Sequence, residues 1–162
     1  MLTKKKRSQK QEKSVAKNLD AKTVIASGAF WGAKGDVRSE QFLFECKTTE
    51  KPKYNFTAKS WEKITKQATA DHMRTPVFVV DICDRERFFI VNAKDFISLI
   101  EDDEVSILYG VDLYSSFVLH KGEETPALQK ITATPNYRQN LFVHELLILN
   151  EKQFKEAAEK WD

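Results

Sequence analysis

Two carboxylates and a lysine have the residue types and spacing best suited to chemistry in this chain. Asp36 lies nine residues before Glu45, and Lys47 follows two residues later within an apolar run that starts at Phe42. Ionised side chains are costly to bury in a strand unless something pairs with them. Because side chains alternate across a strand, Glu45 and Lys47 share one face. A sharp bend between Val37 and Phe42 brings Asp36 beside Glu45, and this arrangement suits a divalent cation and a phosphate.

Mg²⁺ or Mn²⁺ is the cofactor predicted for this cluster, because hard oxygen ligands hold both ions and both promote phosphodiester hydrolysis. Asp36 and Glu45 are the candidate ligands. The backbone carbonyl of Cys46 points near the same spot, whereas its thiol lies on the opposite face and is a poor ligand for a hard cation. Lys47 is expected to contact the attacking water or the phosphate oxygens and to stabilise negative charge in the transition state. The alternative for Glu45 and Lys47 is an ordinary surface ion pair.

Two further residues are candidate catalytic groups. Glu12 aligns with the apolar stripe of a predicted helix, where it could complete a second metal position. The alternative is a partly exposed first-turn glutamate that the helix dipole favours. Gln67 lies on a later helix and could orient the water or a phosphate.

An α/β pattern of elements positions these residues. The periodicity predicts helices over 8–19, 60–73, 94–100 and 151–161, and strands over 23–26, 36–38, 42–48, 76–82, 88–91, 116–120 and 141–149. Residues 49–59 and 125–140 read as loops. On the strand over 42–48, Leu43 shares a face with Glu45 and Lys47, and Cys46 lies on the other face with two phenylalanines. This order predicts a mixed central sheet flanked by helices.

Composition describes an ordinary globular chain. The 162 residues are 41% hydrophobic and 31% charged, and no apolar run approaches the roughly 20 residues of a membrane span. We expect a flexible basic arm over 1–8 and one domain over 9–162, with a core to about 104 and an extension over 105–162. No apolar segment follows the basic start, so a cytoplasmic location and no membrane association are expected. Two cysteines without metal-ligand spacing indicate reduced thiols.

Charge is distributed unevenly and indicates a polyanionic partner. Residues 1–75 hold 17 Lys and Arg against 8 Asp and Glu, whereas residues 76–162 hold 9 against 16. A basic region around an acidic cluster suits a nucleic acid bound through its phosphates. The alternative is a solvated surface with a disordered basic tail, which is the better interpretation for residues 4–7 alone. The aromatic pair in the Gly-flanked loop over 27–35 could be core plugs or a stacking surface for bases. The candidate DNA-binding residues are Lys10, Lys13, Phe30, Trp31, Lys34, Arg38, Lys51, Lys53 and Lys63.

Taken together, these features resemble the PD-(D/E)xK nuclease superfamily. The run Ser27-Gly28 … Gly35-Asp36-Val37 … Phe44-Glu45-Cys46-Lys47-Thr48 is similar to archaeal and phage-type Holliday junction resolvases, over about residues 8–92. The resemblance implies a restriction-endonuclease-like core and a homodimer whose two active sites cut opposing strands of a four-way DNA junction. It assigns Glu12, Asp36 and Glu45 to the metal site, Lys47 to catalysis and Ser27 to the scissile phosphate. The chain departs from the family at its aromatic loop pair and after about Asn92.

Two other functions stay open. A nuclease of the same superfamily could act on duplex ends, specific sites or damaged DNA, because substrate choice lies in loops and dimer geometry. A DNA-binding or assembly protein could keep the fold without catalysis, although a pure binder gains nothing from two carboxylates near phosphates. No phosphate-cradling glycine motif is present, so no nucleotide cofactor is expected. Ser27 lacks a plausible His or Asp partner, which argues against serine-hydrolase chemistry.

Overall fold

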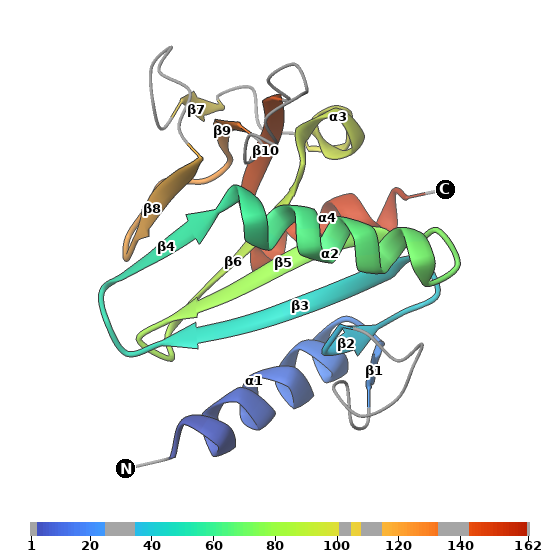
Figure 1. Cartoon of the computed structure of the whole chain (residues 1–162), viewed down its shortest axis with the longest axis vertical. Coiled ribbons are helices and arrows are strands. Elements are labelled where there is room, and N and C mark those ends of the chain that lie inside the picture. The colour runs from blue at the N-terminus through green and yellow to red at the C-terminus, as the bar shows by residue number, and fades with distance from the viewer. Residues whose placement is uncertain (1–2, 25–34, 101–104, 108–114, 133–142, 162) are drawn as a thin grey trace.

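The computed structural model describes residues 3–24, 35–100, 105–107, 115–132 and 143–161 (Figure 1). The elements in chain order are α1 (Lys4–Asn18), β1 (Lys22–Thr23), β2 (Val37–Arg38), β3 (Phe42–Thr49), β4 (Lys53–Thr57), α2 (Ala58–Ala70), β5 (Thr75–Ile82), β6 (Glu86–Asn92), α3 (Ala93–Phe96), the 3₁₀ turn η1 (Ile97–Leu99), β7 (Ser106–Ile107), β8 (Ser116–His120), β9 (Ala127–Thr132), β10 (Val143–Asn150) and α4 (Glu151–Glu159).

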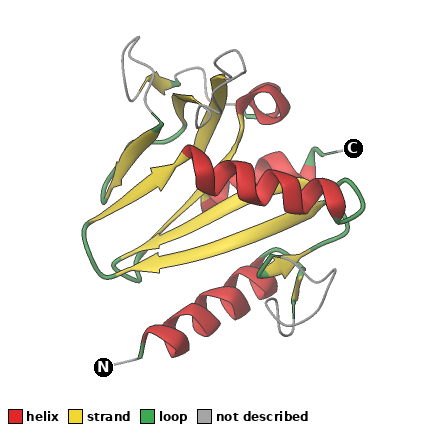
Figure 2. Ribbon diagram, viewed as in Figure 1, coloured by secondary structure: helices red, strands yellow, loops and turns green. Residues whose placement is uncertain are grey.

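Eight strands form one mixed sheet in the order β1-β2-β3-β5-β6-β10-β9-β7, and β4 pairs with β8 in a separate two-stranded sheet. The pairs β3–β5 and β7–β9 are parallel, and the other pairs are antiparallel. Figure 2 shows helices packed against the strands of this sheet. The predicted α/β class, with a mixed central sheet flanked by helices, is confirmed.

Strand β3 divides its side chains between two apolar layers, as its alternation predicts. Leu43 belongs to the layer beneath α2, which also holds Trp61 and Ile64. Phe44 and Cys46 belong to the opposite layer, which α1 and α4 cover. Burying a side chain such as Phe44 contributes on the order of 1.5–3 kcal/mol to folding. Glu45 and Lys47 therefore face the α2 side, and the thiol of Cys46 faces the α1 side.

The described α-helices begin at polar caps, and α1 and α2 begin at least two residues earlier than predicted. Helix α1 starts at Lys4 after Thr3, whose Oγ1 accepts a hydrogen bond from the Lys6 amide. The part of the predicted basic arm from Lys4 onward is therefore helical. Helix α2 starts after Thr57 rather than at Ser60, because the Thr57 hydroxyl accepts from the Ser60 amide. The last helix begins at residue 151 as predicted, after a capping box between Asn150 and Gln153.

Two strands lie where loops were predicted. In β4, Tyr54 is half-buried and Phe56 fully buried, and both alternate with exposed or polar neighbours, but the flanking lysines obscured this period-two pattern. In β9, the buried positions include Gln129, and this polar residue on the core face hid the alternation.

Both cysteines are free, as predicted. Among the described helices, none is both long and apolar enough to cross a bilayer.

Candidate active site

Asp36 is held against the edge of β3 at the point where strand pairing stops. Strand β2 pairs with β3 only through Val37 with Phe44 and Arg38 with Leu43. One residue before β2, the Asp36 amide donates to the Phe44 carbonyl at 2.9 Å. The Asp36 Oδ2 then accepts a hydrogen bond from the Cys46 amide at 2.8 Å. The carboxylate thus replaces the next residue of a partner strand, and it lies beside Glu45 as the predicted bend requires.

Gly35 makes this approach possible. Its φ is +82°, in the left-handed region that residues with a side chain rarely adopt. A Cβ at this position would stand 2.6 Å from Leu43 Cδ1. Both the backbone conformation and the lack of space therefore require glycine immediately before Asp36.

Lys47 turns back onto the acid two residues before it. Its Nζ lies 2.6 Å from Glu45 Oε1 and 3.3 Å from the carbonyl oxygen of Cys46. A second ammonium, Lys63 Nζ on α2, lies 4.0 Å from the same Glu45 oxygen. Glu45 is only 8% exposed, so these cations compensate a buried charge. The Lys47 side chain is 43% exposed, which leaves its ammonium accessible to a ligand.

The electrostatics match a close cluster of charges. Burial raises the pKa of Asp36, and the charge of Glu45 raises it further, against the opposing effects of the Cys46 amide and the Lys47 ammonium. Burial acts to lower the pKa of Lys47, but its hydrogen bond to Glu45 and the neighbouring acidic charges outweigh burial and raise that pKa. The charge of Glu45 therefore acts on Asp36, and Lys47 keeps its proton beside the two acids.

The donor set fits a hard divalent cation. Two carboxylates and the Cys46 carbonyl oxygen come together at the β3 edge, and Mg²⁺ is commonly bound through one or two carboxylates while its other positions hold water or substrate oxygens. Within the described ranges, no three His, Cys, Asp or Glu side chains are grouped closely enough to hold a metal. The expected three-carboxylate set, with Glu12 as its third member, is therefore not assembled.

Glu12 lies near the cluster without joining it, and Gln67 lies on the helix that carries Lys63. Glu12 is half-buried on α1 and accepts a hydrogen bond from the Ser8 hydroxyl at 2.9 Å, while its charge still contributes to raising the pKa of Asp36. Gln67 lies one turn beyond Lys63 on α2, and its Oε1 is buried without a hydrogen-bond partner among the described residues. The catalytic roles proposed for both stay predictions.

The predicted DNA-binding residues fall on several surfaces. Arg38 Nη1 lies 4.0 Å from Asp71 Oδ1, and Lys63 flanks Glu45. The exposed members elsewhere are Lys10 and Lys13 on α1, Lys51 in the turn before β4, and Lys53 at the start of β4. Ser27, Phe30, Trp31 and Lys34 lie outside the described residues.

Sequence reasoning missed two residues beside the cluster. Gln11 on α1 is 3% exposed and donates from Nε2 to the Lys47 carbonyl at 2.7 Å. Its place four residues before the buried Val15 was the available signal. The Tyr54 ring lies 6.2 Å from that of Phe78, the residue paired with Glu45 across β3 and β5. Burial raises the pKa of Tyr54, and the charges of Lys47 and Glu45 act on it in opposite directions, so its hydroxyl is near this cluster.

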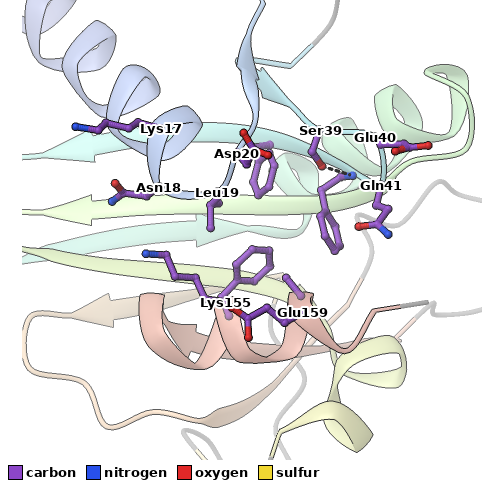
Figure 3. Close-up of a pocket in the computed structure, with 13 residues that line it drawn as sticks. Lys17, Asn18, Leu19, Asp20, Ser39, Glu40, Gln41, Lys155 and Glu159 are labelled. Carbon is purple, nitrogen blue, oxygen red and sulfur yellow. Dashed lines mark hydrogen bonds between the residues drawn. The ribbon is translucent and has the colours of Figure 1, made fainter.

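A pocket of about 610 Å³ lies elsewhere (Figure 3). It is formed by the end of α1, the β2–β3 turn and α4, and Phe42, Phe44 and Phe154 are among its lining residues. These phenylalanines belong to the layer opposite Leu43, so the pocket and the carboxylate cluster lie on different faces of the sheet.

The fold and the site define a mixed α/β protein with an acid–acid–lysine cluster at the edge of a central strand. No protein-family model matches the chain, and no curated protein matches it. Among solved structures it is similar to Hjc, a Holliday junction resolvase from the archaeal hyperthermophile Archaeoglobus fulgidus, with 11% sequence identity and a TM-score of 0.43 over 70% of this chain and 84% of that one. This similarity concerns the fold and assigns no role to any residue of this chain.

Proposed function

We propose that this protein is a metal-dependent endonuclease that hydrolyses phosphodiester bonds in DNA, and specifically a Holliday junction resolvase. The observation that carries the proposal is the convergence of Asp36, Glu45 and Lys47 at one point of the β3 edge. Asp36 is fixed there by the Cys46 amide, and Lys47 Nζ lies 2.6 Å from Glu45. Acids and a lysine joined in this way supply what phosphodiester hydrolysis needs.

Each residue has a distinct task in this proposal. Asp36, Glu45 and the Cys46 carbonyl would hold Mg²⁺ or Mn²⁺, which when bound would supply charge neutralisation for the phosphate and for the attacking water. Glu45 also orients the Lys47 ammonium, whose accessible tip donates hydrogen bonds to the phosphate oxygens as their charge increases. Gln67 orients the attacking water or a phosphate from α2. Glu12 and Ser27 are proposed to complete the site when DNA is bound.

Basic surfaces on both sides of β3 suit a DNA backbone. Helices α1 and α2 cover opposite faces of the sheet (Figure 2). Four exposed lysines recur at helical spacing along the outer side of α1, namely Lys6, Lys10, Lys13 and Lys17. On α2, Lys63 extends basic charge toward Glu45. Phosphates on either side of a scissile bond could be bound by these two helices.

The junction substrate, the homodimer and the cytoplasmic location are further parts of the proposal. Their support is the motif resemblance, which implies two copies of the site cutting opposing strands. A four-way junction presents two opposing strands at its crossover. Two copies of the site in a homodimer would therefore cut these strands symmetrically.

A cleavage assay tests the proposal. Labelled four-way junction and a matched linear duplex are incubated with the protein in Mg²⁺ and, separately, in EDTA. We expect symmetric nicks in the junction, with Mg²⁺ only and with no cutting of the duplex. Equal cutting of both substrates would replace the resolvase with another nuclease of the superfamily. Binding without metal-dependent cutting would contradict the nuclease and favour the non-catalytic DNA-binding protein.

A further inference from the structure

We propose that Gln11 is a positioning residue for Lys47, and that its side-chain amide fixes the backbone from which the Lys47 ammonium reaches the substrate. The inference rests on the proposed nuclease function and goes beyond it, because neither the motif nor its spacing assigns a role to this glutamine. Gln11 itself does not contact the reacting atoms in this proposal. It acts through the β3 backbone.

Gln11 contacts β3 beyond the end of its pairing with β2, while the pairing of β3 with β5 on the other side continues to Thr49. Pairing with β2 ends at Phe44, and beyond it two side chains hold successive residues of β3. The Asp36 carboxylate accepts from the Cys46 amide, and Gln11 Nε2 donates to the Lys47 carbonyl at 2.7 Å. These contacts come from different segments and hold neighbouring residues of β3, Cys46 by its amide and Lys47 by its carbonyl.

Core packing does not account for an amide at this position. Gln11 is 3% exposed and lies on the buried side of α1 with Val15 and Ala16. Its Nε2 is bonded, but its Oε1 is buried without a partner among the described residues. A buried acceptor without a hydrogen bond is destabilising, and an apolar side chain of the same length avoids that cost. A residue that is unfavourable for stability but bonds the motif backbone is expected at a functional site.

Fixing the Lys47 backbone matters because of the length of its side chain. The ammonium is held between Glu45 Oε1 and the Cys46 carbonyl, at 2.6 and 3.3 Å. A small rotation of the peptide unit after Lys47 is amplified along its four-carbon chain. Misplacement of a catalytic group by about 1 Å can reduce a rate by up to roughly 100-fold.

The test is Gln11→Met, which keeps the side-chain length and removes both the donor and the buried acceptor. The melting temperature is expected to stay unchanged or rise, and junction binding in EDTA to stay unchanged. The cleavage rate at saturating junction and Mg²⁺ is expected to fall about 5- to 20-fold, less than the full cost of a misplaced group. A rate equal to wild type, or a melting temperature that falls together with the rate, would overturn the proposal.

Ser14→Ala is the matched control. Ser14 lies one turn further along α1 and accepts a hydrogen bond from Arg87 Nη1 at 3.2 Å, so its hydroxyl ties the same helix to β6. Its substitution is expected to leave the cleavage rate unchanged, and an equal loss of rate would show a general effect of helix docking. The ¹⁵N signal of the Lys47 ammonium separates this inference from the nuclease assignment. Gln11→Met is expected to shift it and Ser14→Ala to leave it in place, even if wild type cuts no DNA, and an unshifted signal in Gln11→Met would overturn the inference.

Discussion

Asp36→Asn is expected to lower the rate of junction cleavage by about 1,000-fold or more, beyond the usual cost of losing one electrostatic contact in a transition state. Asparagine keeps a side-chain oxygen that can accept from the Cys46 amide, so the β2–β3 edge should remain folded. It removes the negative charge that a divalent cation requires. Single-turnover cleavage measures the rate, and junction binding in EDTA measures the interface, which should be unchanged.

Glu40→Gln is the control for Asp36→Asn. Glu40 is an exposed acid in the turn between β2 and β3, on the same hairpin as Asp36. Its neutralisation should leave cleavage within about 2-fold of wild type, as expected for a surface charge away from the chemistry. If Asp36→Asn lost binding in proportion to cleavage, a catalytic role for Asp36 would be excluded.

Lys47→Met is expected to lower the cleavage rate by about 100- to 1,000-fold, the range for removing one preorganised donor to a developing negative charge. Methionine retains most of the apolar stem but loses the ammonium that lies 2.6 Å from Glu45. Junction binding and the requirement for Mg²⁺ should persist, because Asp36 and Glu45 remain. Lys47→Arg should restore little of the rate, since a planar guanidinium does not occupy the position of a compact ammonium.

Lys63→Met separates this effect from a general loss of positive charge. Lys63 Nζ lies 4.0 Å from the same Glu45 oxygen, but its side chain is 65% exposed and approaches from α2. We expect at most about a 10-fold loss of rate, because an exposed ion pair of this kind contributes little. Equal losses in the two variants would remove the distinction between Lys47 and a nearby surface lysine.

Much of the site could be predicted because it depends on local sequence. Alternation along β3 placed Glu45 and Lys47 on one face and the Cys46 thiol on the other, and the two apolar layers confirm this. The sharp bend predicted between Val37 and Phe42 is the short hairpin that joins β2 to β3. The strand predicted over 76–82 is β5, which pairs on both sides in the sheet. In each case the deciding pattern lies within about ten residues of chain.

The remaining features depend on contacts between distant segments. Periodicity placed Glu12 on the inner side of α1, but the full helix buries Gln11 and leaves Glu12 half-exposed. The bond from Gln11 to the Lys47 carbonyl joins residues 36 positions apart, and no local pattern reports it. Strand β4 was hidden because its partner, β8, lies about 60 residues later in the chain, and its own alternation is framed by lysines.

Anomalous diffraction from crystals soaked in Mn²⁺ measures the proposed metal centre directly. The expected result is a manganese peak at the β3 edge with oxygen atoms of Asp36, Glu45 and the Cys46 backbone at about 2.0–2.3 Å, the spacing of a hard divalent cation, and with the Lys47 ammonium beside it. A fully soaked crystal with no peak there, with Asp36 still bonded only to the Cys46 amide, would contradict the metal-dependent nuclease.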